Sequence, residues 1–431
     1  MSCFVSSSAI SRKGTMSSFR DDAVLRWLLW GALLLALLGA LVSVHVHFTR
    51  QNPGGTDFLD YWVAARHFLL QGESPYSQPV ILDIQRRIYG RPAYAWENQH
   101  RPIYPFHFVF LFAPFALVGD YPLARALWMV VNEVLLVVGV LLWLPLLPWT
   151  PRPLARAALL LYTLLGYFSV RGLVNGNFVV LQTAFFLLGV YALARGRDGL
   201  GGAILALTTV KPHIALLPLV LVALWSASRR RWGVWLGLGG TLVVLLGAAT
   251  WLQPDWWLQD LRLILAYPSY NPPGSPQEVL RLALPGPGRL LAWVLTALVW
   301  GVLLAEWVAL WGRSFTHFLW TFSLTLLASQ WSGIQTDPGN LMVTLPALVV
   351  VWGYWCTRWA YGRRLFWGTW VLAMVGNWAL FLSTLRWVGG QPIQSPMLYF
   401  PFPMLVFFML YTVRVWATRV PLLREDALFV E

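Results

Sequence analysis

The sequence is poor in charge. Asp, Glu, Lys and Arg make up only 11% of its 431 residues, whereas 58% are hydrophobic. A soluble domain carries roughly 25% charged residues, so the deficit indicates that lipid surrounds much of the chain. Aromatic side chains are abundant instead, with 27 Trp and 15 Tyr, as expected where amphipathic rings lie at membrane–water interfaces.

Two further scarcities exclude classes of site. The only cysteines are Cys3 and Cys356, which are too few for a disulfide framework or a cysteine-based metal site. The formal charge of +13 reflects only 18 acidic residues against 31 basic ones, and the basic residues form no dense patch with interleaved aromatic side chains. We therefore expect this charge to act at a membrane surface, and we expect no nucleic-acid partner.

Long apolar segments recur along the whole chain. A membrane-spanning helix needs about 20 mostly apolar residues, and the first such segment, 23–48, is too long and too late for a cleaved secretory signal. The pattern predicts an all-α polytopic membrane protein with about eleven or twelve spans. The later segments lie near residues 104–118, 123–147, 154–170, 178–194, 200–225, 233–252, 290–311, 315–331, 341–355, 366–385 and 397–416.

These segments predict a cytoplasmic tail at residues 1–22, one transmembrane domain at 23–417 and a C-terminal tail at 418–431. Two loops inside the domain, 49–103 and 253–288, are long, and their aromatic and aliphatic content argues against disorder. We expect both loops to be ordered, external and functional. Loop 49–103 carries five of the 18 acidic residues, namely Asp57, Asp60, Glu73, Asp83 and Glu97.

The arginines predict the orientation of the spans. Residues 195–197 and 229–231 are Arg-rich short loops and should be cytoplasmic, which places Lys211, between them, on the external side. The basic N-terminal tail should also be cytoplasmic, which places loop 49–103 outside. The two assignments differ by one crossing if every middle segment spans fully, so we expect one of these segments to be re-entrant or broken.

Residues 54–76 carry the most informative pattern. The spacing predicts an amphipathic helix of about three turns along the outer interface. Asp57 lies just before this helix, where a partly buried carboxylate of raised pKa can act as a general base towards an acceptor hydroxyl. Asp57 could equally cap the helix, with Asp60 complementing its positive end. The apolar face holds Tyr61, Ala65, Phe68 and Leu69, and the polar face holds Asp60, His67 and Gln71.

This stretch resembles the first-loop signature of glycosyltransferase family 87 (DUF2029), the polyprenyl-phosphate-mannose-type transferases of the GT-C superfamily. That signature reads Asp-Phe/Leu-x-x-Tyr, then a helix with Ala and Arg, then Gly-x-x-Pro-Tyr. It is matched by Asp57, Phe58, Tyr61, Ala64, Ala65, Gly72, Pro75 and Tyr76. Further similar pieces, over residues 50–235, are Tyr104-Pro105 with Ala113-Pro114-Phe115, Gly176-Asn177-Phe178 (Asn177 stands where the family usually has Gln) and Lys211-Pro212.

The resemblance implies a GT-C-like helical bundle and a reaction. A hexose, most naturally mannose, would pass with inversion from a polyprenyl-phosphate donor to a lipid or glycan acceptor at the external face of a bacterial-type inner or plasma membrane. By carry-over Asp57 is the expected base, and Asp60 is a second choice or a group that holds the acceptor. Tyr61, Tyr76 and Asn177 are the expected substrate contacts.

The leaving group in such a reaction is a lipid phosphate, and fixed cations stabilise the charge that it gains. Lys211, one of only two lysines, and Arg171 are candidates for this role, and His213 is a candidate substrate contact. Each has an ordinary alternative: a snorkelling lysine, an orientation signal and an interfacial histidine. Glu133 and Glu306 lie in apolar segments, where an acid is functional, protonated or paired with an arginine.

Other classes of protein remain open on the sequence alone. No His, Asp or Glu cluster has metal-ligand spacing and no nucleotide-binding motif is present, so we expect no metal or cofactor and no nucleotide-sugar donor. A transporter or flippase should show inverted repeats; none is visible, but the Lys211-Pro212 break is compatible with one. A scaffold protein would not need Asp57. A ligase using lipid-pyrophosphate donors would place Arg and His in a large late loop, whereas the largest polar loop here is the first.

Overall fold

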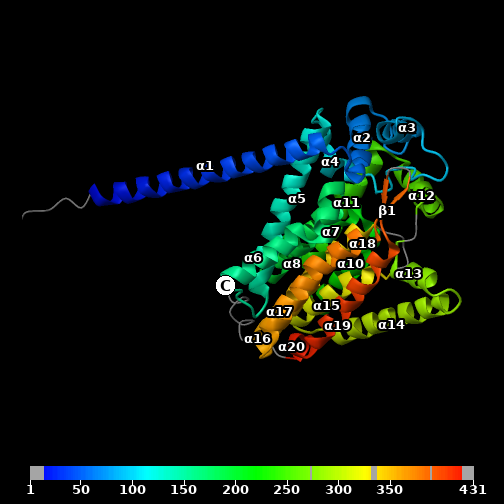
Figure 1. The fold of residues 1–431 in the computed structure, drawn as a ribbon. Helices are drawn as coiled ribbons and strands as arrows, with labels where there is room; N and C mark the ends of the chain where they lie inside the picture. The colour runs from blue at the N-terminus through cyan, green and yellow to red at the C-terminus, as the bar shows by residue number, and fades with distance from the viewer. Residues whose placement is uncertain (1–13, 272–273, 332–336, 389–390, 420–431) are drawn as a thin grey trace, which may run out of the picture.

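The computed structural model describes residues 14–271, 274–331, 337–388 and 391–419 (Figure 1). The chain is an all-α polytopic membrane protein, as the sequence predicts, with a single short β-hairpin among the described residues. Six described helices are long and apolar enough to cross a membrane: α1, α5, α11, α14, η4 with α16, and α17 with η5 and α18. The bent pair α6–α7 raises this number to seven, and α8, α9 with η2, α10, and η6 with α19 are shorter apolar helices.

In chain order the described elements are α1 (Gly14–Gln51), α2 (Thr56–Gln71), α3 (Gln78–Tyr89), α4 (Phe108–Ala116), α5 (Tyr121–Trp143), η1 (Leu144–Leu146), α6 (Pro153–Leu165), α7 (Tyr167–Asn175), α8 (Val179–Ala194), α9 (Asp198–Ala206), η2 (Leu207–Val210), α10 (Pro212–Ser228), α11 (Trp232–Leu252), α12 (Trp256–Ala266), η3 (Tyr267–Ser269), α13 (Pro276–Ala283), α14 (Pro287–Leu310), α15 (Phe315–Ser329), η4 (Pro338–Thr344), α16 (Leu345–Arg358), α17 (Gly362–Val371), η5 (Leu372–Gly376), α18 (Asn377–Thr384), β1 (Arg386–Val388), β2 (Gln391–Ile393), η6 (Pro396–Tyr399), α19 (Pro401–Thr412) and α20 (Arg414–Arg419).

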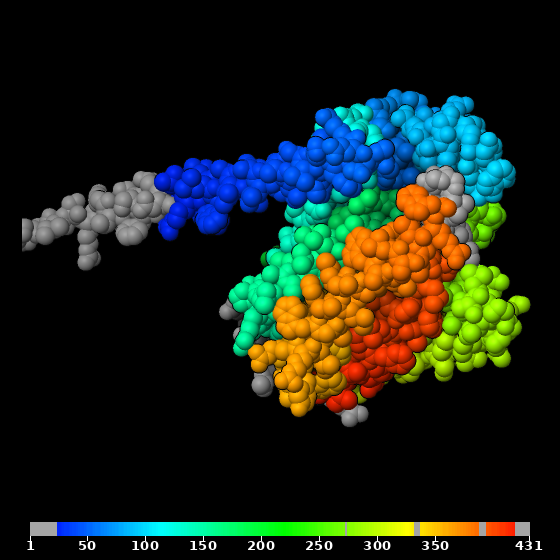
Figure 2. All heavy atoms as spheres, in the orientation of Figure 1, coloured from blue at the N-terminus to red at the C-terminus, as the bar shows by residue number. Residues whose placement is uncertain are grey.

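Helix α1 extends away from the rest of the molecule (Figures 1 and 2). It begins at Gly14, within the stretch predicted as a tail, and its apolar middle contacts almost no other element. Only its last turns pack on α5, where His45 contacts Glu133 at 2.8 Å and the Thr49 hydroxyl donates to the carbonyl of Pro122 at 2.9 Å. An apolar helix with this exposure is suited to lipid contact.

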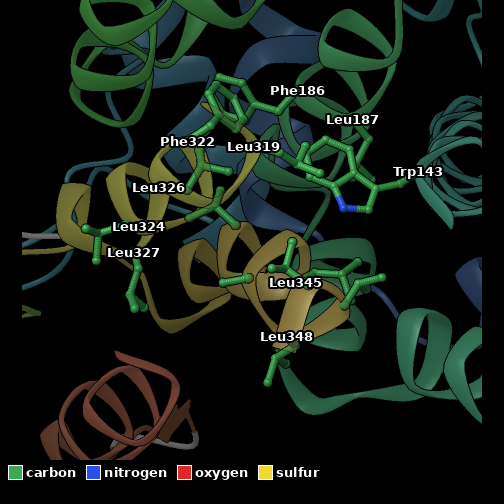
Figure 3. Packing of buried hydrophobic residues seen from close by; sticks show 14 of the residues in the cluster. Trp143, Phe186, Leu187, Leu319, Phe322, Leu324, Leu326, Leu327, Leu345 and Leu348 are labelled. Atoms are coloured by element: carbon green, nitrogen blue, oxygen red, sulfur yellow. The ribbon is translucent and has the colours of Figure 1, made fainter. Parts of the chain in front are cut away.

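The centre of the bundle is formed by α5, α8, α15 and α16. Figure 3 shows Phe186 of α8 beside Phe322 of α15, whose ring centroids lie 5.8 Å apart, and Leu345 of α16 in the same cluster. These side chains are at most 3% exposed. Because α15 and α16 are buried on nearly all sides, they form a rigid support for the turns at one end of the bundle.

The Arg-rich loops 195–197 and 229–231 lie at one end of the bundle and the predicted site residues at the other. At the first end Arg231 pairs with Asp198, and Arg229 donates to the carbonyl of Gly312. At the opposite end the break before α10 brings Lys211 close to the start of α2. This arrangement agrees with the predicted hairpin between residues 197 and 229, and the cytoplasmic assignment of the arginine end stays a prediction.

The predicted span at residues 104–118 is wrong. Its helix, α4, has only nine residues, about 14 Å of length, whereas the hydrocarbon core is about 30 Å thick. The aromatic side chains of α4 pack on protein: the ring of Phe112 lies 5.9 Å from Phe58 of α2 and 4.5 Å from Trp128 of α5. Since α4 does not cross, the loops on both sides of it share one face, and the one-crossing conflict in the predicted topology disappears.

Both long loops form ordered structure at the end that holds Lys211. The first loop contains α2, α3 and α4, and the second contains α12 and α13 (Figure 1). The two are joined by a hydrogen bond of 2.7 Å from the hydroxyl of Ser74 to the side-chain oxygen of Gln259. Together they cover the end of the bundle where the candidate site lies.

Candidate active site

Two glycines allow the first turn of α2 to approach the bundle. Gly55 and Gly176 have φ angles of 72° and 73°, a left-handed conformation that glycine adopts without strain. A Cβ atom at Gly55 would lie 2.3 Å from the Nε of Arg125, and one at Gly176 would lie 2.3 Å from the Cβ of Phe58. Arg125 stabilises this close packing by donating hydrogen bonds to the carbonyls of Asn52, at 2.9 Å, and Val174, at 2.6 Å.

Asp57 lies in the first turn of α2 and does not cap the helix. The cap position is occupied by Gly55, and no side-chain capping bond is made there. The carboxylate of Asp57 instead accepts a hydrogen bond of 2.7 Å from the side-chain amide of Asn177, at the turn between α7 and α8. The structure therefore excludes the capping role, while Asp57 still lies in the first turn, where an acid complements the positive helix end. Its hydrogen bond joins it to a second motif residue 120 positions away.

The environment of Asp57 makes it a stronger base than a free aspartate. Burial disfavours the charged carboxylate and Asp337 repels it, while Lys211 and Arg171 attract it, and the balance raises the pKa of Asp57 to about 6. Such a group is mostly ionised at neutral pH, yet it accepts a proton far more readily than an exposed aspartate. These are the properties that general-base catalysis requires.

Lys211 lies on the opposite side of Asn177 from Asp57 and is only 3% exposed. Its ammonium donates to the side-chain oxygen of Asn177 at 2.6 Å and to that of Asn340 at 2.5 Å. The bond from Lys211 fixes the orientation of the Asn177 amide, because it engages the oxygen and leaves the NH₂ group to donate to Asp57. Asn340, the third residue of η4, is a part of the site that the sequence patterns did not identify.

A second acid–base pair lies beside this chain of hydrogen bonds. Arg171 of α7 donates to the carboxylate of Asp337 at 2.8 Å, and Asp337 also accepts from the backbone N–H of Gly339 at 2.7 Å. Although burial opposes the change, the charge of Arg171 and its hydrogen bond lower the pKa of Asp337. The two carboxylates at this end thus differ in basicity, and Asp57 is the one suited to accept a proton.

Asp60 takes part in a separate pair. It is 8% exposed, and one of its oxygens contacts the Nδ1 of His100 at 3.1 Å. Burial raises the pKa of Asp60, and His100 opposes this change. The other oxygen of Asp60 is buried and has no hydrogen-bond partner among the described residues. His100 has a φ of 44°, an uncommon conformation for a residue with a side chain.

The two predicted tyrosines form a wall beside the site. The ring of Tyr61 stacks on that of Tyr104, with centroids 4.3 Å apart, and the hydroxyl of Tyr76 donates to the carbonyl of Tyr104 at 2.8 Å. The ammonium of Lys211 lies 5.7 Å from the centroid of Tyr104, which is within the range of a cation–π contact. All three tyrosines are at most 6% exposed.

The remaining candidates are not joined to Asp57 by hydrogen bonds. The Nε2 of His213, in the first turn of α10, is buried and has no hydrogen-bond partner among the described residues. Glu133 pairs with His45, and Glu306 pairs with Arg414 at 2.6 Å. The arginine-paired interpretation is therefore confirmed for Glu306.

The sequence was also compared with models of protein families. The model for glycosyltransferase family 87 matches residues 103–330, more than half of the chain. The chain belongs to glycosyltransferase family 87. No curated protein and no solved structure shows significant similarity to the transferase. The matched region contains Arg171, Asn177 and Lys211, while the fold brings in Asp57 from before it and Asn340 from after it.

Proposed function

We propose that this membrane glycosyltransferase moves a hexose, with mannose as first choice, from a polyprenyl-phosphate donor to a hydroxyl of a lipid or glycan acceptor. The reaction takes place at the external face of a bacterial-type plasma membrane and inverts the anomeric centre. The observation that carries the proposal is the carboxylate of Asp57, which is partly buried, has a pKa raised to about 6 and is held by Asn177 with Lys211 behind it.

The proposed step is a single displacement. The acceptor hydroxyl attacks the anomeric carbon while Asp57 takes its proton. The bond between that carbon and the phosphate oxygen breaks, and the oxygen leaves with the electron pair. One carboxylate is sufficient for this step, because a phosphate ester is a good leaving group and needs no acid to protonate it. A positioned base contributes typically a factor of about 10² to 10⁴ to the rate.

The cations near Asp57 fit the departure of a phosphate. We assign Arg171 and Lys211 to the charge that develops on the leaving group. Arg171 is partly exposed and can reach the donor, although it must share its guanidinium with Asp337. Lys211 is buried behind the two asparagines, so its contribution is a fixed positive potential.

The acceptor is assigned to the next turn of α2, on the same side of the helix as Asp57, where its hydroxyl can reach that carboxylate. The unpartnered oxygen of Asp60 can accept a hydrogen bond from an acceptor hydroxyl. Tyr61 and Tyr76 are buried against Tyr104, so we assign them to positioning this side of the site for the substrate. His213 is assigned to the substrate side of Lys211, where a donor or acceptor hydroxyl would satisfy its Nε2.

The proposal is tested with purified protein in nanodiscs and a panel of radiolabelled polyprenyl-phosphate sugars. The wild type should transfer sugar from at least one of them, and Asp57→Asn should not. Asp120→Asn is the matched control. It is the same chemical change at the same end of the molecule, and Asn can keep the bond by which Asp120 caps α5.

The outcomes separate the enzyme from its rivals. Equal turnover by Asp57→Asn and the control would remove Asp57 from the mechanism. An absence of turnover with every polyprenyl-phosphate sugar would overturn the donor assignment. Nucleotide-sugar and lipid-pyrophosphate donors would then be assayed. Movement of a lipid-linked sugar across the bilayer without transfer would support the flippase alternative.

A further inference from the structure

A pocket between α2 and α3 is not used by the proposed reaction. It has a volume of about 190 Å³, and Arg66, which lines it, points away from the catalytic carboxylate. Arg66 follows Asp57 by nine residues, about two and a half turns, so the two side chains point in opposite directions. The pocket is lined by Trp62, Val63, Arg66, His67, Leu70, Gln71, Asp83 and Arg87.

Two guanidinium groups converge on the floor of this pocket. The floor is formed by Trp62 and Val63, which are 3% and 1% exposed. The guanidinium carbon of Arg66 lies 5.2 Å from the centroid of the Trp62 ring, and that of Arg87 lies 5.9 Å from it. Arginines from two different helices thus flank one aromatic ring, and both can donate to a ligand above it.

The charges in the pocket do not balance. Arg87 pairs with Asp83 at 3.0 Å, and Asp83 also contacts His67 at 3.0 Å. His67 in turn contacts Glu73 at 2.9 Å on its other nitrogen. Arg66 donates to the carbonyl of Ala116 at 2.7 Å and forms no ion pair with any described residue. Within the lining two guanidinium groups thus face one carboxylate, Asp83, and Arg66 has no ion-pair partner among the described residues; Glu73 lies outside the lining, beyond His67.

The pocket lies close to the end of α1 and the start of α5, two helices apolar enough to span a membrane. Ala116, which Arg66 contacts, is four residues before Asp120, the cap of α5. Asp120 also contacts Arg50, in the last turn of α1, at 3.5 Å. Beside this junction Leu117 is 62% exposed, and Leu70, at the edge of the pocket, is 56% exposed. Unpaired positive charge next to exposed leucines is the pattern expected at the depth of lipid headgroups.

We propose that the pocket between α2 and α3 binds the phosphate of an anionic phospholipid, with Arg66 and Arg87 contacting the phosphate and Leu70 and Leu117 contacting the acyl chains. Its volume is below the roughly 300–1,000 Å³ of pockets that enclose drug-sized ligands, so it suits a headgroup better than an oligosaccharide. A lipid held there would steady α2, whose first turn carries Asp57.

The test measures which lipid stays with the purified full-length protein. Detergent-solubilised protein is incubated with equal amounts of phosphatidylglycerol and phosphatidylcholine, and retained lipid is counted by native mass spectrometry. The wild type should retain phosphatidylglycerol preferentially. Each basic residue near a membrane surface contributes enough for about a fivefold change in binding, so Arg66→Gln with Arg87→Gln should lower retention by about 25-fold.

The controls keep the test decisive. Arg86→Gln removes an exposed charge on the same helix but outside the pocket and should retain the lipid as the wild type does. Arg87→Gln alone changes an exposed side chain and should lower lipid retention about fivefold. This single variant replaces the double variant if the latter fails to fold. Asp57→Asn should retain the lipid fully, so this result does not depend on the proposed reaction.

Three results would overturn the inference. They are equal retention of both lipids by the wild type, unchanged retention in a folded double or Arg87→Gln variant, and an equal loss in Arg86→Gln. Displacement of the lipid by a low concentration of inorganic phosphate would mark a free-anion site and would also reject the lipid assignment.

Discussion

Replacing Lys211 by methionine should move the pH dependence of transfer to higher pH. Asp57 must be ionised to accept a proton, so the rate of the wild type should rise as the pH passes the pKa of Asp57, about 6. It should level off until the pH nears 8, because burial lowers the pKa of Lys211 to about 8 and its charge is lost above that pH. The positive charge of Lys211 favours the ionised form and lowers this pKa. Without that charge the pKa rises, and a higher pH is needed to reach the same fraction of active base.

The size of the shift follows from the chain of hydrogen bonds. Lys211 and Asp57 are joined through Asn177 by contacts of 2.6 and 2.7 Å, which with the amide between them keep the two charges within about 8 Å. At an effective dielectric constant near 20, charges about 8 Å apart interact by about 2 kcal/mol. This energy corresponds to a shift of about 1.5 pH units.

The assay is kcat/KM for a donor that the wild type accepts, measured from about pH 5 to about pH 9. The midpoint of the rising limb is the quantity to compare, because Lys211→Met should also lower the plateau by weakening stabilisation of the leaving phosphate. Asp120→Asn should give the same midpoint as the wild type. A midpoint in Lys211→Met equal to that of the wild type, or a flat wild-type profile through pH 6, would refute the electrostatic account of Asp57.

Three other contacts can be tested one at a time. Gly176→Ala forces a Cβ to within 2.3 Å of that of Phe58 and should destabilise the fold by about 1–3 kcal/mol, seen as a lower Tm. Asn177→Ala removes the hydrogen bond to Asp57 and should lower kcat about ten- to hundredfold with little change in donor KM. Arg414→Leu leaves Glu306 without its ion-pair partner and should lower Tm, and adding Glu306→Gln should recover most of the loss. An unchanged Tm or kcat would contradict the corresponding contact.

Part of the site could be predicted because its residues lie at helix ends. Asp57 lies in the first turn of α2, Asn177 at the turn between α7 and α8, and Lys211 at the break before α10. In a polytopic protein the alternation of spans assigns such ends to one face, so local motifs and arginine counts can place them on the same side. The hydrogen bonds between them could not be predicted, because they depend on the axial position of each helix relative to its neighbours.

The hydrogen bonds made by the C-terminal half could not be predicted, although the turn that holds Asp337 could be identified as a weak candidate for lining the acceptor cleft. Asn340 contacts Lys211 across 129 positions, and Asp337 contacts Arg171 across 166. Both acceptors lie beside a Pro-Gly turn, which is an ordinary sequence feature with no functional signature. The packing of η4 against α7 and α8 brings this turn close to the loop that carries Asp57.

The error at α4 has a simple physical cause. A window of apolar residues reports that a segment avoids water, but it does not report whether lipid or protein provides the alternative. In α4 the aromatic side chains face α2 and α5. The short apolar stretch, with Pro105 before it and Pro114 within it, was the available sign that the segment does not span.

The central claim is that Asp57 accepts the proton of the incoming hydroxyl. The most direct test is the turnover of Asp57→Asn with an accepted donor, with the affinity for that donor measured on the same preparation. Loss of the base should lower kcat by about 10² to 10⁴ and leave the donor Kd nearly unchanged, because the amide keeps the shape of the side chain. Turnover close to that of the wild type, with donor binding intact, would show that the proton goes elsewhere.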